Sequence, residues 1–128
     1  MAIFVNKKAH ILAVDDDTDL LILFRGSMQA RDYVVDISIN GDNIWECIEK
    51  KRPDVIMLDV HMNGKEGSDI CKELKNNVAT SSIPIIMLSA TDDLKKVSED
   101  CGADSYLSKP FNADKVAYEI EKILSKNN

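Results

Sequence analysis

The 128-residue sequence lacks the features that mark several classes of protein. Its three cysteines, Cys47, Cys71 and Cys101, are odd in number and far apart, and none stands in a Cys-x-x-Cys pair. This spacing argues against zinc binding and dithiol redox chemistry, so we expect three reduced, partly buried thiols. No apolar run approaches the ~20 residues of a membrane span, and the opening MAIFVNKKAH is too weakly apolar for a signal peptide. We therefore expect a cytoplasmic protein with no membrane partner.

Positive charge is also scarce. Lys and Arg number 16 and Asp and Glu number 22, so the formal net charge is -6. Binding to a phosphate backbone needs a basic face, so this balance argues against direct contact with nucleic acid without excluding a local basic patch. Hydrophobic residues make up 45% and charged residues 30%, which is typical of one globular domain with its own core.

Apolar runs alternate with amphipathic segments along the chain. The apolar runs predict five strands, at residues 10–14, 34–38, 54–58, 83–88 and 105–108. Three of these runs are almost continuously apolar, as in strands that are covered on both faces of a parallel sheet. The segments that follow carry apolar residues at helical spacing and predict five helices. Strands that alternate with helices define a doubly wound α/β fold with right-handed crossovers.

Local signals indicate where some helices begin and how they pack. Asp17 and Asn112 are placed to cap the first and last helices, and we favour this capping role for Asp17 over a role in a site. Thr91, followed by two acids, suits the start of the fourth helix. Trp45, on the second helix, is interpreted as a packing residue.

Polar residues follow four of the five predicted strands, where ligands bind in open parallel sheets. They are Asp15, Asp16 and Asp17 after the first strand, Asp59 after the third, Ser89 after the fourth and Lys109 after the fifth. Each has an ordinary explanation by itself, such as a strand end, a turn hydroxyl or a solvated lysine. These explanations do not account for their common position at one edge of the sheet.

Acidic residues gathered at one edge repel each other. Two unit charges ~4 Å apart at an effective dielectric of about 20 cost roughly 4 kcal/mol, which a divalent cation such as Mg²⁺ and a lysine can offset. Acids, a metal, a cation and a hydroxyl around one central carboxylate suit phosphoryl transfer. The central carboxylate, Asp59, can then act as a nucleophile and form an acyl phosphate.

Four motifs in register resemble the receiver domain of bacterial two-component response regulators, from about Ala9 to the final helix. They are ILAVDDD, DVIMLDVHMNGKEG, IPIIMLSA and GADSYLSKPF. The resemblance implies a CheY-like, flavodoxin-like (βα)5 fold whose five-stranded parallel sheet has the order 2-1-3-4-5. It also implies one receiver domain over residues 1–128, with a loosely held lead-in at 1–8 and a core at about 9–126.

The resemblance further implies a role for each site residue. Asp59 would accept a phosphoryl group from a phosphohistidine on a sensor histidine kinase or a histidine phosphotransfer protein. Asp15, Asp16, the Asp59 carboxylate and the backbone carbonyl of His61 would hold Mg²⁺, for which Mn²⁺ is a possible substitute. The chain would be a signal relay rather than a turnover enzyme, although it could catalyse its own phosphorylation and dephosphorylation.

The switch residues follow from the same resemblance. Ser89 and Lys109 would contact the bound phosphoryl group, and the Lys109-Pro110 bond would be cis. Tyr106 matches the aromatic position that turns inward when Ser89 moves. The fourth helix, fifth strand and fifth helix would form the output face for a downstream protein, and a phosphorylation-dependent dimer is possible there.

Four positions differ from the usual family pattern or lie where the family varies. The family often has proline where Asn63 stands, so we expect a more mobile loop, and Ser89 replaces the commoner threonine. His61 and Thr91 lie at variable positions beside the site, and we hypothesise that they set the lifetime of the phosphoryl group. His61 could equally be a merely exposed residue.

Other functions are compatible with parts of this pattern. A flavin carrier would need a phosphate-cradling loop after the first strand, where this chain has DDDTD. A Mg²⁺-dependent phosphatase would place a D-x-D-x-T motif there, but Asp19 stands where the threonine belongs. A docking module that takes no phosphate is a third alternative. The chain fits both a stand-alone regulator and the receiver part of a longer one.

Overall fold

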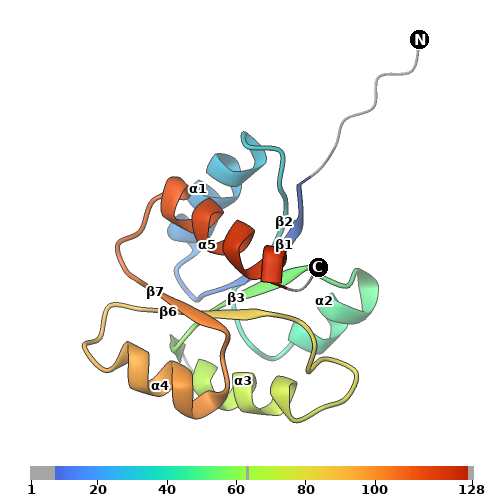
Figure 1. Cartoon of the computed structure of the whole chain (residues 1–128), viewed down its shortest axis with the longest axis vertical. Coiled ribbons are helices and arrows are strands. Elements are labelled where there is room, and N and C mark those ends of the chain that lie inside the picture. Colours follow the sequence, from blue (N-terminus) through green and yellow to red (C-terminus); the bar gives the residue numbers. More distant parts are fainter. Residues whose placement is uncertain (1–7, 63, 127–128) are drawn as a thin grey trace.

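The computed structural model describes residues 8–62 and 64–126, and its centre is a five-stranded parallel sheet (Figure 1). The strands are β1 (His10–Val14), β2 (Val34–Ser38), β3 (Val55–Asp59), β6 (Ile85–Ser89) and β7 (Ser105–Ser108). The helices are α1 (Thr18–Gln29), α2 (Ile44–Lys50), α3 (Gly67–Lys75), α4 (Leu94–Cys101) and α5 (Ala113–Lys126). The strand order is β2-β1-β3-β6-β7, which confirms the predicted 2-1-3-4-5 order of a flavodoxin-like doubly wound fold.

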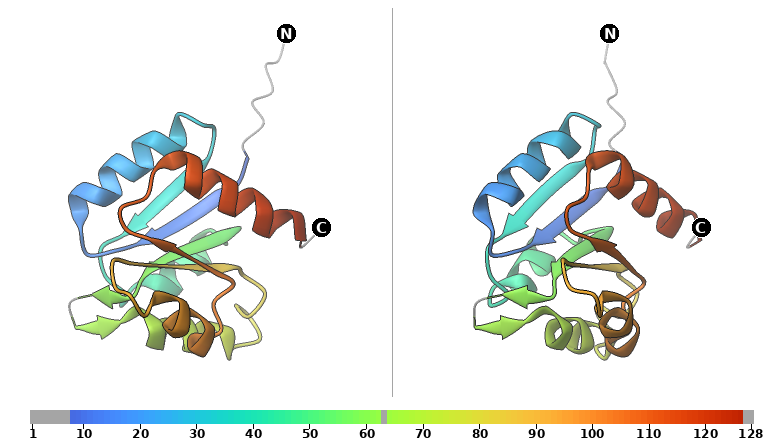
Figure 2. Two further views of the ribbon diagram at one scale, coloured as in Figure 1. Left: turned by 60° about the vertical axis from the view of Figure 1, so that its left-hand side comes forward. Right: turned by 90° about the vertical axis from the view of Figure 1, so that its left-hand side faces the viewer.

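Helices cover both faces of the sheet (Figure 2). Along β1, Ile11 and Ala13 pack in the core with α1 and α5, whereas Leu12 and Val14 pack in the core with α2, α3 and α4. Successive side chains of a strand point to opposite faces, so a strand buried on both sides needs apolar residues at every position. This requirement explains the continuous apolar runs in the sequence.

Two strand boundaries differ from the prediction. The third strand runs from Val55 to Asp59 rather than over residues 54–58. Asp54, just before it, donates its N–H to the His10 carbonyl at 2.8 Å and accepts from the His10 N–H through its carboxylate at 2.7 Å. The fourth strand begins at Ile85, not at residue 83, since Pro84 has no N–H to donate to a ladder. Asp59 therefore lies within the sheet, opposite Leu88, instead of in the loop that follows.

The capping predictions are confirmed for α1 and α5 and wrong for α4. Asp17 Oδ1 accepts from the Leu20 N–H at 3.1 Å, and Asn112 Oδ1 accepts from the Lys115 N–H at 2.9 Å. Asp93 precedes α4 without a side-chain cap, and the Thr91 hydroxyl bonds to Ser89 instead. The packing role of Trp45 is confirmed, because this α2 residue is half-buried and packs against the core on its side of the sheet.

The sequence pattern missed a short antiparallel hairpin after β3. Its strands are β4 (His61–Met62) and β5 (Lys65–Glu66), and His61 pairs with Glu66. The loop mobility expected at Asn63 and the lead-in expected at 1–8, apart from Lys8, lie outside the described residues. Within residues 8–62 and 64–126, no helix is long and apolar enough to span a membrane.

Candidate functional site

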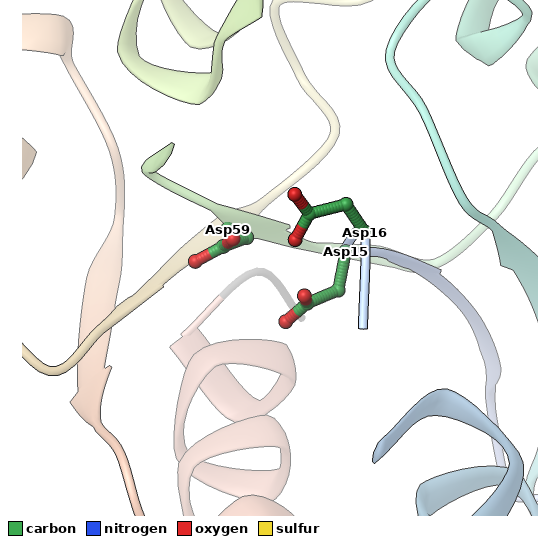
Figure 3. A group of neighbouring side chains, drawn as sticks. All are labelled: Asp15, Asp16 and Asp59. Carbon is green, nitrogen blue, oxygen red and sulfur yellow. The ribbon is translucent and has the colours of Figure 1, made fainter. Parts of the chain in front are cut away.

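Three carboxylates gather where β1 and β3 end (Figure 3). Asp15 is fully buried, Asp59 is 6% exposed, and Asp16 is exposed. One carboxylate oxygen from each of the three residues lies within 4.8 Å of the others. The strands bring them together, since β1 and β3 are neighbours and Val14 pairs with Leu58, each one residue before its aspartate. The sequence predicted that these acids lie together at one edge of the sheet, and the structure places them there.

Lys109 links two of these carboxylates. Its Nζ lies 2.7 Å from Asp15 Oδ2 and 3.3 Å from Asp59 Oδ1. Burial by itself lowers the pKa of Lys109, but the hydrogen bond and charge of Asp15, together with Asp59, outweigh it, so the pKa is raised. The Lys109 backbone N–H donates to the Ser89 carbonyl at 2.9 Å, and the Lys109-Pro110 peptide bond is cis. The ammonium is thus held between the two acids from the end of β7.

The environment of Asp59 disfavours its charged form. Burial, and then the charge of Asp15, raise its pKa to about 6, while Lys109 acts in the opposite direction and Asp16 raises the pKa further. Three clustered carboxylates form a donor set that suits a hard divalent cation such as Mg²⁺.

This raised pKa predicts a pH-dependent stability. The folded pKa of about 6 lies above the unfolded value of 3.8, so the folded chain keeps a proton that the unfolded chain releases as the pH rises. Ionisation of Asp59 therefore destabilises the fold between about pH 4 and pH 6, by about 3 kcal/mol in total, and the loss levels off above pH 6. Urea unfolding with a chelator present, for the wild type and Asp59→Asn, measures this: the variant's advantage grows over that interval. A difference that is constant from pH 4 to pH 7 contradicts it.

Ser89 lies at this edge, and its hydroxyl bonds to Thr91. Ser89 is 3% exposed, and its Oγ lies 2.9 Å from Thr91 Oγ1 and accepts from the Thr91 N–H at 3.1 Å. Thr91 thus holds the hydroxyl in a turn after β6. The sequence placed both residues beside the site but did not predict this contact.

The remaining candidates lie further out. The His61 ring is exposed, and its Nδ1 lies 2.9 Å from Glu66 Oε2 across the hairpin. Tyr106 lies on β7 opposite Met87 and is 39% exposed. A groove of about 570 Å³ opens beside the site between α1 and the segment after β7, with Leu23, Lys109 and Phe111 in its lining.

Gly67 is a site residue that the sequence analysis did not single out. A Cβ at this position would lie 1.8 Å from the backbone oxygen of Asp59, and the Gly67 N–H donates to the Val60 carbonyl at 2.7 Å. The start of α3 therefore packs directly against the backbone of β3 at Asp59. Its signal in the sequence was the glycine that ends the motif DVIMLDVHMNGKEG.

Comparisons with known proteins agree with this geometry. The family model described as "Response regulator receiver domain" matches residues 11–121. Response regulator MprA of Mycobacterium leprae is 33% identical over 117 residues, which are 90% of this chain and 50% of MprA. Transcriptional regulatory protein PhoP of Bacillus subtilis, named for alkaline phosphatase synthesis, is 32% identical over 125 residues, 96% of this chain and 50% of PhoP.

A solved structure shows the same fold. The crystal structure of a putative response regulator from Chloroflexus aurantiacus has a TM-score of 0.85 and 30% identity, and the match covers 93% of this chain and 99% of that one. The chain belongs to the response regulator receiver family, as the motifs indicated. Members of this family are signalling proteins that take phosphoryl groups from histidine kinases and bind Mg²⁺ at the acidic pocket. The chain spans about half the length of the curated relatives it matches.

Proposed function

We propose that Asp59 is the phosphoacceptor of this receiver and takes its phosphoryl group from a sensor histidine kinase or a histidine phosphotransfer protein. The observation that carries this proposal is Lys109, whose ammonium lies 2.7 Å from Asp15 and 3.3 Å from Asp59. A cation within contact of a buried carboxylate is placed to neutralise the charge that a phosphoryl group adds there. Of the three acids, Asp59 combines burial, contact with Lys109 and a rigid position in the strand ladder.

The transfer itself needs one bond made and one bond broken. A carboxylate oxygen of Asp59 attacks the phosphorus atom, the P–N bond to the donor histidine breaks, and its electron pair returns to the imidazole. Lys109, whose raised pKa keeps it an ammonium, stabilises the charge on the phosphoryl oxygens. Mg²⁺, held by Asp15, Asp16, Asp59 and the His61 carbonyl, would supply the positive charge that favours ionised Asp59, and Mn²⁺ could replace it.

Phosphorylation then acts as a switch in this proposal. The Ser89 hydroxyl leaves Thr91 and binds a phosphoryl oxygen, and Tyr106 turns inward from its half-exposed position. The added charge and the new hydrogen bonds bias an equilibrium between two arrangements of α4, β7 and α5. A downstream protein or a second copy of the chain reads that face.

In this proposal the chain is a signal relay rather than a turnover enzyme. Residues 1–128 form one receiver domain with its core at about 9–126. The domain also catalyses its own dephosphorylation, which ends the signal. The net charge of -6 supports protein partners over direct contact with nucleic acid.

Intact mass after incubation with Mg²⁺ and a small acyl-phosphate donor tests this function. The wild type is expected to gain one phosphoryl group, and the gain is expected to disappear when a chelator removes the metal. If no mass is gained although Mg²⁺ binding is confirmed separately, for instance by titration calorimetry, the phosphoacceptor proposal is wrong and a docking module that takes no phosphate replaces it.

We also propose that His61 and Thr91 set the lifetime of the phosphoryl group. Thr91 holds the Ser89 hydroxyl, so it affects how readily Ser89 reaches the phosphoryl oxygens. His61 begins the hairpin that directly follows the acceptor strand, and Glu66 orients its ring. A neutral imidazole there can take a proton from the water that attacks the phosphorus atom.

Replacing His61 by Ala is expected to slow dephosphorylation about 3- to 10-fold, which is a small part of a typical general-base effect because the ring is exposed. The decay of the phosphorylated species, followed by intact mass after the donor is removed, measures the rate. Glu73→Gln is the matched control, because Glu73 pairs with Lys65 of the same hairpin. If the decay rate is unchanged in His61→Ala, His61 is an exposed surface residue with no role in dephosphorylation.

A further inference from the structure

Two of the three cysteines meet between α3 and α4, although they stand 30 positions apart along the chain. Cys71 lies in α3 and Cys101 ends α4, and they are 0% and 3% exposed. The Cys71 thiol donates to the backbone carbonyl of Cys101, with Sγ and O 3.4 Å apart. The two helices lie side by side below the sheet (Figures 1 and 2). Spacing along the sequence argued against dithiol chemistry, but it carried no information about this contact.

The two thiols also interact with each other. A hydrogen bond with Cys101, and then burial, raise the pKa of Cys71, whereas the hydrogen bond from Cys71 lowers the pKa of Cys101 in spite of burial. The two sulfurs therefore lie within interaction distance of each other, in the buried contact between α3 and α4. A thiolate is the nucleophilic form of cysteine, and a neighbouring thiol can resolve its oxidised product.

We infer that Cys71 and Cys101 are an oxidation site that closes a disulfide between α3 and α4 when the chain meets a small peroxide. The thiolate of one of the two cysteines attacks one peroxide oxygen, the O–O bond breaks, and the products are a sulfenic acid on that cysteine and hydroxide, which takes up a proton. The sulfur of the other cysteine then attacks the oxidised sulfur, the S–O bond breaks, and water leaves with the second thiol's proton. In sum, two thiols and hydrogen peroxide give one disulfide and two waters.

The surroundings of the pair suit this chemistry. The site is closed to bulk solvent, which favours a small oxidant over a bulky disulfide reagent. Ser98 lies one helical turn before Cys101 on the buried side of α4, and its carbonyl accepts from the Cys101 thiol at 3.4 Å. Its own hydroxyl is buried and has no hydrogen-bond partner within the described ranges 8–62 and 64–126.

The disulfide has a consequence for the proposed signalling role. Because α4 is part of the proposed output face, the bond would fix one edge of that face to α3. This consequence rests on the proposed function, whereas formation of the disulfide does not.

Counting free thiols after peroxide treatment tests the inference without any phosphorylation step. The reduced full chain is treated with hydrogen peroxide, quenched with catalase, denatured and alkylated with iodoacetamide, and its intact mass is measured. Untreated wild type carries three alkyl groups, one for each free cysteine. Treated wild type is expected to carry one, on Cys47, and its proteolytic map is expected to contain a Cys71–Cys101 linked peptide.

Cys47→Ser is the matched control, because Cys47 is the remaining free thiol and lies half-buried on α2. This variant is expected to lose both remaining thiols on treatment, whereas Cys71→Ser is expected to form no internal disulfide. Treatment in urea is expected to remove the selectivity, since the contact depends on the fold. The inference would be overturned by any of three results: three alkyl groups on treated folded wild type, a link that involves Cys47, or the same linkage at the same rate in urea. All three are measured on the wild type, so none depends on how a variant folds.

Discussion

Replacing Asp59 by Asn is expected to abolish the gain of a phosphoryl group from a small acyl-phosphate donor. An amide has no carboxylate oxygen to attack the phosphorus atom, so the loss is complete rather than partial. The variant is also expected to stay folded and to be more stable than the wild type at neutral pH, because it removes a buried carboxylate whose pKa is raised to about 6. Intact mass and urea unfolding on the same samples separate a lost acceptor from a lost fold.

Asp17→Asn is the matched control for this experiment. Asp17 belongs to the acidic run Asp15-Asp16-Asp17 that lies near Asp59, but its carboxylate caps α1 by accepting from the Leu20 N–H at 3.1 Å. Asparagine caps helices about as well as aspartate, so this variant is expected to gain the phosphoryl group at the wild-type level. Loss of phosphorylation in both variants would mean that the acidic run as a whole, and not Asp59 as an acceptor, is needed. Retained phosphorylation in Asp59→Asn would contradict the assignment of Asp59.

Replacing Gly67 by Ala is expected to destabilise the fold by about 3 kcal/mol and to slow phosphorylation. The new Cβ would lie 1.8 Å from the Asp59 backbone oxygen and 2.8 Å from its carbonyl carbon. A backbone atom has no alternative rotamer, so either α3 or the end of β3 must shift, and overpacking of this kind costs about 1–3 kcal/mol or more. A shift of β3 moves the acceptor carboxylate relative to Lys109.

Gly26→Ala is the matched control, because in the described part of the chain no atom beyond the adjacent residues and the local backbone of α1 lies within 4 Å of a Cβ at this position. The same substitution there is expected to stabilise the chain by about 0.5–1 kcal/mol, as alanine is the better residue in a helix interior. Urea unfolding measures both changes, and the acyl-phosphate reaction measures the effect on the site. Equal stabilities for the two variants would show that α3 can move away from β3 without cost.

Much of the fold could be predicted because burial leaves a periodic pattern in the sequence. Strands covered on both faces must be apolar at every position, so β1, β3 and β6 are recognisable from their residues alone. The caps at Asp17 and Asn112 could be predicted for the same kind of reason, since a side chain and an N–H three residues later meet through local geometry. Strand ends were less certain because partners on the neighbouring strand decide which residues are paired, as Asp59 opposite Leu88 shows.

The candidate site, too, could be predicted only in part from the sequence. That Asp15, Asp59, Ser89 and Lys109 would share one edge followed from the sequence, because the carboxyl ends of parallel strands meet there. The roles assigned by resemblance, such as the Tyr106 switch and the Mg²⁺ ligands, remain predictions. The prediction that Thr91 caps α4 was wrong, because its hydroxyl instead hydrogen-bonds to the Ser89 hydroxyl in the turn after β6.

The sequence alone determined the class of fold, the family and the set of residues at the acidic edge, since each of these follows from patterns within single elements and their order. Only the tertiary structure decided which of those residues touch. Lys109 bridges Asp15 and Asp59 from 94 and 50 residues away, Gly67 packs against the Asp59 backbone, and Cys71 meets Cys101. The physical reason is that contact, burial and the resulting pKa values depend on how separate elements pack, and spacing along the chain does not record that.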